Sequence, residues 1–308
     1  MKPSILVLYY TQSGQLREIL DSLISDVREA ATFTFAPIEP QTPFPLPWKA
    51  HNFFDAMPET VMQLPIPLKP LSQEVMNKHY DLVILGYQPW FLHPSQPINA
   101  FLKSEQAVIL KGKPVVTVIG ARNMWLNAEE KIKEDLARLG ATLTGNIALV
   151  DTNPNLVSVL TVIRWSFKGQ KEAGRFLPAA GVQDKDIKNA RKFGPIILSH
   201  LKNNTLDTLH GNLLANGSLS LEPGLVLLEK RGIKNFKIWS KYIADKGGPG
   251  DPARKGRVTQ FKRLLVVGIF ILSPISNLTA FIQRQIQKKK LQQDVDYFRQ
   301  VGYEPGRF

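Results

Sequence analysis

Apolar runs of strand length that alternate with helical patterns constrain the fold of this chain most. Residues 5–10 (ILVLYY) form an unbroken apolar run, which is typical of a parallel strand buried on both faces. A polar loop follows, and apolar residues then recur at helical spacing over residues 16–24. Further strands are predicted at 32–36, 80–86, 113–120 and 147–150, and further helices at 97–102, 127–139 and 184–201, the last with Asp184 as its N-cap. This alternation predicts an α/β fold with a doubly wound parallel sheet.

A proline-rich stretch separates the second and third predicted strands. Residues 37–70 contain nine of the 22 prolines, interleaved with aromatic residues. Proline at this density is incompatible with long helices and central strands. Loops of this length in compact domains usually act as lids or binding loops. We therefore predict that residues 37–70 are a lid over a hydrophobic site, with a rigid surface loop as the alternative. The predicted substrate-contacting residues are Phe44, Trp48, Phe53 and Phe54.

Positive charge is concentrated near the C-terminus. The net charge is +13, and residues 229–290 contribute +12 of it, with fifteen basic and three acidic residues. They enclose the most apolar run of the chain, residues 264–282, which is just long enough to span a bilayer. Pro274 lies in the middle of this run and favours a re-entrant or interfacial segment over a single span. The alternative is a buried core helix with solvated basic ends.

These features predict where the chain works and what it binds. The N-terminus has no signal-peptide pattern, so we expect a cytoplasmic protein attached to the anionic cytoplasmic face of the membrane. Nucleic-acid binding is not expected, because the basic region contains no zinc-finger, RNP or helix-turn-helix pattern. The absence of cysteine excludes disulfides, a thiolate nucleophile and Cys-ligated metals, so redox chemistry would need a dissociable cofactor. We predict no metal centre, and a homodimer is one option for the assembly.

Three loops leave the carboxyl ends of predicted strands, where doubly wound sheets bind ligands. Residues 11–16 offer two hydroxyls, amides and a glycine before a helix, which suits one phosphate bound by neutral donors. Residues 87–95 place Trp90 and Phe91 where a planar ring can stack, and residues 120–125 form the third loop. A phosphate and a flat ring together indicate a mononucleotide such as FMN. The predicted cofactor-binding residues are Thr11, Gln12, Ser13, Gly14, Gln15, Leu16, Gln88, Pro89, Trp90, Phe91, Gly120, Arg122, Asn123 and Trp125.

At these loops residues 1–203 resemble the flavodoxin-like family. The family's phosphate loop, hydroxyl-x-hydroxyl-Gly-x-Thr, is similar to TQSGQL at 11–16, with Leu16 in place of the final threonine. Its ring-stacking loop is similar to Pro89-Trp90 and the following SQPINAFL at 95–102. The resemblance implies FMN binding and the strand order 2-1-3-4-5. Residues 204–308 are then a basic, partly hydrophobic C-terminal extension.

The unusual segments give a closer resemblance. YYTQSGQL (9–16), PFPLPW (43–48), FFDAMPE (53–59), YQPWFL (87–92) and ARNMWL (121–126) together resemble the proteins labelled dialkylresorcinol condensing enzymes, from bacterial clusters for dialkylresorcinols and flexirubin-type pigments. The resemblance implies that a partner ketosynthase performs the condensation. It also implies that this chain is an FMN-dependent oxidoreductase that aromatises a 2,5-dialkylcyclohexane-1,3-dione to a 2,5-dialkylresorcinol.

Such an aromatisation needs a hydride acceptor, a proton acceptor and an apolar pocket. His93 is a candidate base, and the alternative is a surface-loop histidine. Arg122 is a candidate for stabilising an enolate oxygen or reduced flavin, and the alternative is a loop-to-surface ion pair. His51 and Asp55, in the predicted lid, are further candidates for the proton acceptor.

Two other functions are compatible with the sequence. One is a flavodoxin-type electron-transfer protein at the membrane. The other is a flavin-free scaffold partner of a ketosynthase, which Leu16 keeps open. The nearly neutral first domain and its large insertion favour the oxidoreductase over the electron carrier.

Overall fold

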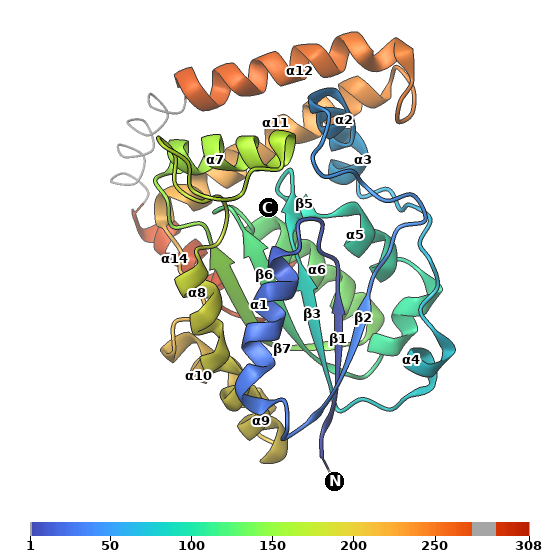
Figure 1. Ribbon diagram of the computed structural model, residues 1–308, viewed down its shortest axis with the longest axis vertical. Helices are drawn as coiled ribbons and strands as arrows, with labels where there is room; N and C mark the ends of the chain where they lie inside the picture. Colours follow the sequence, from blue (N-terminus) through green and yellow to red (C-terminus); the bar gives the residue numbers. More distant parts are fainter. Residues whose placement is uncertain (1, 273–287, 308) are drawn as a thin grey trace.

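The computed structural model describes residues 2–272 and 288–307. A parallel five-stranded sheet forms its centre, with the order β2-β1-β3-β6-β7 (Figure 1). The two short strands β4 and β5 pair only with each other, so the sheet strands taken in chain order run 2-1-3-4-5. The predicted α/β, flavodoxin-like fold is therefore confirmed. The sheet strands are β1 (Ser4–Tyr9), β2 (Thr32–Pro37), β3 (Leu82–Tyr87), β6 (Pro114–Ala121) and β7 (Thr142–Val150).

Helices cover both faces of the sheet because each central strand is apolar on both sides. Ile5 and Val7 of β1 pack with one set of helices, and Leu6 and Leu8 pack with the other. The first set contains α1 (Gln15–Ile24), α8 (Asp184–Asn189), α9 (Phe193–Lys202) and α10 (Leu206–Ala215). The second contains α5 (Gln96–Leu102), α6 (Leu126–Leu139), α11 (Pro223–Ala244) and α14 (Lys288–Phe298).

The helix predicted over residues 184–201 is interrupted. A 3-10 turn, Ala190–Lys192, separates α8 from α9, and the N-cap of α8 is Gln183, so the prediction of Asp184 was wrong. Pro195 gives a physical reason for the interruption, because it lacks the N–H that would bond to the carbonyl of residue 191 and its ring crowds that carbonyl.

Residues beyond 203 build on the same core as the sheet. Leu209 and Leu213 of α10 join the cluster on one face, and Val226 and Leu227 of α11 join the cluster on the other. Gly145 of β7 permits this packing, because a Cβ there would lie 2.7 Å from Cδ1 of Leu213. The C-terminal extension is therefore packed against the flavodoxin-like sheet over its described length.

A layer of helices lies over the carboxyl edge of the sheet (Figure 1). It comprises the insertion (residues 37–70) with α2 (Ala50–Asp55) and α3 (Met57–Val61), together with α7 (Asn155–Lys168), α11 and α12 (Lys255–Val267). We call this layer the cap. Its interior is an aromatic cluster in which Phe54 packs against Phe167 and Phe261, with ring centroids 6.3 and 6.1 Å apart.

A buried ion cluster fixes the insertion to the C-terminal helices. Arg254 is 0% exposed, and its guanidinium donates to Asp55 Oδ1 at 2.7 Å and to Glu59 Oε1 at 2.6 Å. The second oxygen of Asp55 accepts the Gly250 N–H at 2.8 Å. Asp55, one of the candidate proton acceptors, is thus occupied in holding α2 to the segment before α12. His51 lies on α2, half-buried.

The predicted membrane segment is described only in part. Residues 264–267 end α12, and a π-helical turn follows at Gly268–Leu272. Residues 273–282 lie outside the described residues. None of the helices within 2–272 and 288–307 combines the length and apolarity that crossing a membrane requires.

Candidate functional site

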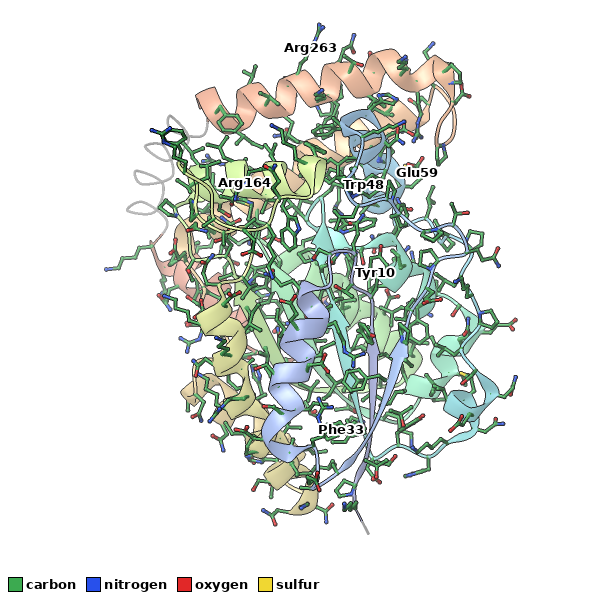
Figure 2. The ribbon with its side chains drawn as sticks, in the orientation of Figure 1. Tyr10, Phe33, Trp48, Glu59, Arg164 and Arg263 are labelled. Carbon is green, nitrogen blue, oxygen red and sulfur yellow. The ribbon has the colours of Figure 1, made fainter. Side chains whose placement is uncertain are left out.

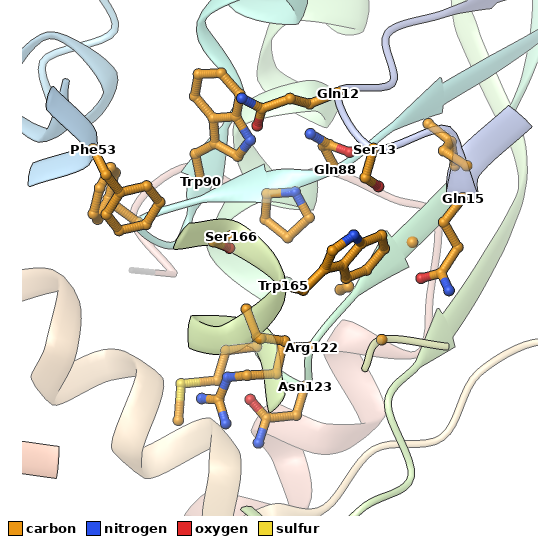
Figure 3. A pocket seen from close by; sticks show the side chains of 18 of the residues that line it. Gln12, Ser13, Gln15, Phe53, Gln88, Trp90, Arg122, Asn123, Trp165 and Ser166 are labelled. Carbon is orange, nitrogen blue, oxygen red and sulfur yellow. The ribbon is translucent and has the colours of Figure 1, made fainter. Parts of the chain in front are cut away.

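A cavity of about 320 Å³ lies where β1, β3 and β6 end, between the sheet and the cap (Figure 3). All three loops singled out in the sequence contribute to its wall. Among the predicted cofactor-binding residues, those that line it are Gln12, Ser13, Gln15, Leu16, Gln88, Pro89, Trp90, Phe91, Gly120, Arg122 and Asn123.

The loop before α1 turns sharply at Gly14, which has φ 85° and is the N-cap of the helix. Thr11 Oγ1 accepts the Gly14 N–H at 3.1 Å and so holds the turn. Thr11 and Gly14 therefore shape the loop and do not line the cavity. Ser13 projects its hydroxyl at the wall, beside the start of α1, whose first N–H groups have no acceptor within the helix (Figure 3). This end of the cavity is suited to an anion.

The two residues after Gly14 have structural contacts. The Gln15 side chain donates to Val182 O and accepts the Val182 N–H, each at 3.0 Å. This clamp leaves no room for a side chain at Gly181, whose Cβ would lie 2.5 Å from Gln15 Oε1. Leu16, which stands where the family has threonine, is buried in the core. Its two methyl carbons lie 3.5 and 3.6 Å from where a Cβ would stand at Gly86 and Gly120, so the Leu16 side chain packs against these two glycines.

The second loop is a tight hairpin of β4 (Pro89–Trp90) and β5 (His93–Pro94). Its two turn residues, Phe91 and Leu92, have φ 48° and 66°. Bulky residues rarely adopt this left-handed conformation, which is usually found in glycine or asparagine. The turn is held from outside, because Asn127 Nδ2 donates to the Leu92 carbonyl at 2.8 Å. Gly232 of α11 gives room for Leu92, since a Cβ there would lie 2.9 Å from its Cδ1.

His93 is 1% exposed, so its interpretation as a surface-loop histidine is wrong. Its Nδ1 lies 2.8 Å from the Phe91 carbonyl oxygen, which stabilises the same turn. Burial lowers the pKa of His93 to about 4, so the ring is neutral near pH 7. His93 is not among the residues that line the cavity.

Aromatic rings connect the hairpin to the insertion. The Trp90 ring lies edge-on to the rings of Tyr10, Phe44 and Trp48, with centroids 5.9, 4.9 and 5.9 Å away. Trp48 and Phe53 of the insertion line the cavity. Phe44 lies behind Trp48, and Phe54 belongs to the interior of the cap. The structure thus brings two of the four predicted substrate-contacting residues to the cavity wall.

The third loop forms a polar corner. Arg122 Nη1 donates to Asn155 Oδ1 at 2.6 Å, and Asn123 Nδ2 donates to the same oxygen at 2.9 Å. Burial lowers the pKa of Arg122 to about 10, while Asp151 opposes the shift, so the guanidinium is charged at neutral pH. Within the described residues Arg122 forms no ion pair, so the predicted alternative, a loop-to-surface pair, is wrong. The buried Oδ1 of Asn123 accepts no hydrogen bond from the described chain.

Sequence reasoning missed the part of the wall that comes from α7 and α11. Trp165 of α7 lines the cavity (Figure 3), and Phe236 comes from α11. The apolar pattern of residues 156–167 could have indicated a helix, but its place over the cavity depends on tertiary packing. The lining residues not predicted are Leu46, Leu92, Ala121, Met124, Val162, Trp165, Ser166, Gly181 and Phe236.

Trp125 lies apart from this cavity, 1% exposed in the core and at the N-cap of α6. It lines a neighbouring cavity of about 420 Å³, together with Glu229 of α11. Glu229 Oε1 accepts the Asn127 N–H at 2.8 Å, so α11 supplies the cap for α6 and thereby fixes the loop of residues 120–125. Burial raises the pKa of Glu229 to about 7, and hydrogen bonds from the start of α6 partly oppose the shift.

No protein-family model and no curated protein matches the chain. Solved structures similar to it include a flavoprotein from Lactobacillus acidophilus NCFM in complex with FMN, at 17% identity, covering 48% of this chain and 93% of that one, with a TM-score of 0.38. A flavodoxin from the domain Archaea is similar at 13% identity, covering 65% and 99%, with a TM-score of 0.33. Both likenesses are low, and the fold assignment rests on the strand order.

The Glu229 carboxyl predicts a pH dependence of stability. Between its ordinary pKa of 4.5 and the folded value of about 7, the folded chain keeps a proton that the unfolded chain has lost. Stability should therefore fall as pH rises through this window, by about 3 kcal/mol. In Glu229→Gln the amide oxygen still accepts the Asn127 N–H but does not ionise. Urea unfolding at pH 5 and pH 7.5 should show a smaller fall for Glu229→Gln than for the wild type. An equal fall in both proteins would contradict the assignment.

Proposed function

We propose that the cavity binds FMN and that the chain is a flavin-dependent oxidoreductase. The observation that carries this proposal is the convergence of three unlike walls on one cavity. Ser13 and the start of α1 form an end suited to a phosphate, the Pro89–Phe91 hairpin and Trp165 form apolar sides suited to a planar ring, and Arg122 and Asn123 form a polar corner. An FMN molecule presents a phosphate, a planar ring and a polar ring edge in the same way.

The chemistry of the donors fits this group residue by residue. Asn123 Oδ1 is a buried acceptor with no partner in the described chain, and the ring edge of FMN offers an N–H. Among the described residues Arg122 has no carboxylate partner, and its charged guanidinium suits a ring carbonyl or a negatively charged reduced ring. Leu16 removes one hydroxyl of the family's phosphate loop, so the phosphate would depend on Ser13 and the N–H groups at the start of α1.

For the substrate we propose a lipophilic cyclic diketone, a 2,5-dialkylcyclohexane-1,3-dione that is aromatised to a 2,5-dialkylresorcinol. Bound FMN would supply the acceptor for two electrons in the form of a hydride. The apolar residues of the cap exclude water and suit alkyl tails. Those at the cavity wall are Leu46, Trp48, Phe53, Val162 and Phe236.

The cavity wall contains no carboxylate or histidine among the described residues, which bears on the proton acceptor. A 1,3-dione is itself a weak acid, so it can enter as an enolate that a cation stabilises. Arg122 is the charged group at the wall, and we propose that it holds this enolate oxygen or the reduced ring. His93 would act only indirectly, by fixing the hairpin turn.

The same proposal sets the chain in a sequence of reactions. A condensing ketosynthase would supply the cyclic diketone, and the chain would consume it. Two alternatives remain: a flavodoxin-type electron carrier and a flavin-free scaffold. The apolar cap over the cavity favours a small organic substrate over electron transfer alone, whereas Leu16 is the feature that favours the scaffold.

Replacing Gly14 tests cofactor binding. In Gly14→Ala the side chain has space but the left-handed backbone is disfavoured by about 1 kcal/mol. The loop should relax and displace Ser13, and FMN affinity should fall about tenfold, the effect of losing one charge-assisted hydrogen bond. Gly112→Ala is the matched control, because Gly112 also has positive φ and open space but lies outside the cavity wall. Titration of FMN fluorescence should show a defect only in Gly14→Ala, and equal affinities in both variants would count against the proposed phosphate loop.

Anaerobic mixing with a synthetic dialkylcyclohexanedione tests the reaction. The flavin absorbance should bleach as one resorcinol forms per flavin, since aromatisation removes two electrons.

Trp48→Ala and Phe236→Ala should raise the diketone concentration for half-maximal rate about tenfold, because each removes apolar contact with a tail. Leu64→Ala, an exposed position of the same insertion, should not. A flavin that stays oxidised would point to the electron carrier, and unchanged kinetics in Trp48→Ala and Phe236→Ala would exclude the cap from the substrate site.

A further inference from the structure

Exposed apolar side chains are concentrated on the cap. Of the thirteen large apolar residues that are exposed in the described chain, Val108 alone lies far from it. Phe176, 84% exposed, follows α7 in the chain, and the others lie on the insertion, α7, α11 and α12. On α7 they form a stripe at helical spacing: Leu156, Leu160 and Ile163. A surface of this kind usually marks an interaction site.

Basic side chains surround these residues. Ile238 of α11 is 67% exposed, with the exposed Lys234, Lys237 and Lys241 within one helical turn of it. At the end of α12, Lys262 and Arg263 precede the exposed Leu264, Val266 and Val267. Figure 2 shows Arg263 projecting away from the body of the molecule. Acidic residues are few here, since residues 223–267 contain only Glu229, Asp245 and Asp251, and Glu229 is buried.

We propose that the outer face of the cap docks on an anionic lipid bilayer. The apolar residues of α7, α11 and α12 would enter the boundary between headgroups and acyl chains, while the lysines contact lipid phosphates. Lysine suits this arrangement, because its alkyl stem lies along apolar surface while its ammonium reaches the headgroups. The centres of protein interfaces are depleted in lysine, which makes a protein partner a poorer match for this face.

The proposed docking face and the cavity lie on opposite sides of α7 and α11. On α7, Leu160 faces outward while Val162 and Trp165 line the cavity. On α11, Ile238 faces outward while Phe236 lines the cavity. A lipophilic substrate dissolved in the bilayer would therefore have only the thickness of the cap to cross. This last step rests on the proposed function, whereas the docking itself does not.

Flotation of the full chain with lipid vesicles tests the docking. Vesicles of phosphatidylcholine with an equal amount of phosphatidylglycerol should bind the chain, and pure phosphatidylcholine vesicles should bind it far more weakly. Lys234→Gln/Lys237→Gln/Lys241→Gln should weaken binding about a hundredfold, since each lysine near an anionic bilayer contributes about fivefold. Leu156→Gln/Leu160→Gln should weaken it about tenfold through lost apolar insertion. Residues 264–282 are intact in all these proteins, so the differences report on α7 and α11.

Two matched controls separate docking from general effects. Val108→Gln removes the exposed apolar residue that lies away from the cap, and Lys185→Gln/Lys188→Gln/Lys202→Gln removes three exposed lysines on α8 and α9. Both should bind anionic vesicles as the wild type does. Failure of the wild type to bind, or equal binding by all variants, would overturn the proposal. The proposal would also be overturned if the wild type formed a dimer that did not bind vesicles and that Leu156→Gln/Leu160→Gln dissociated. The outer face of the cap would then be the contact surface for a second copy of the chain. None of these readouts requires bound flavin, so they are independent of the proposed enzyme activity.

Discussion

One face of α11 determines the geometry of the candidate site. Glu229, Gly232 and Phe236 recur at spacings of three and four residues, so they lie along one side of the helix. Glu229 accepts the Asn127 N–H at the start of α6 and fixes the third loop. Gly232 gives room for Leu92, and Phe236 forms part of the cavity wall. The hairpin turn at residues 91–92 has an unfavourable backbone conformation, and such turns persist only where their surroundings hold them. The C-terminal region is therefore a structural part of the site.

The sequence predicted the sheet and the loops at its carboxyl edge because these depend on local pattern. Residues 5–10 are apolar throughout, which indicates a buried parallel strand, and the position of Gly14 before a helical stripe indicates the turn into α1. The contributions of α7 and α11 could not be predicted in this way. Trp165 and Phe236 reach the cavity through packing between segments far apart in the chain, and nothing local marks Gly232 as the contact of Leu92. His93 shows the same limit, since a histidine before proline gives no sign of complete burial.

The cap brings together three segments that are far apart in the sequence. The proline-rich insertion, the basic C-terminal region and the apolar residues of α7 meet in one layer, which Arg254 joins through its bonds to Asp55 and Glu59. Removing one partner of this buried ion cluster would strongly destabilise the fold, because the remaining partner would be left as an uncompensated buried charge. The layer is consequently fixed over the cavity, with apolar walls inside and a basic, apolar surface outside. The proposed oxidation of a hydrophobic substrate drawn from a membrane would need such an arrangement.

Flavin binding by the purified chain is the most direct test of this account. After incubation with FMN and removal of the unbound cofactor by gel filtration, the protein should be yellow and should carry about one flavin per chain, with the visible absorbance band shifted by the apolar walls of the cavity. A colourless protein that also fails to quench FMN fluorescence would contradict the account, and would leave the fold without its proposed redox function.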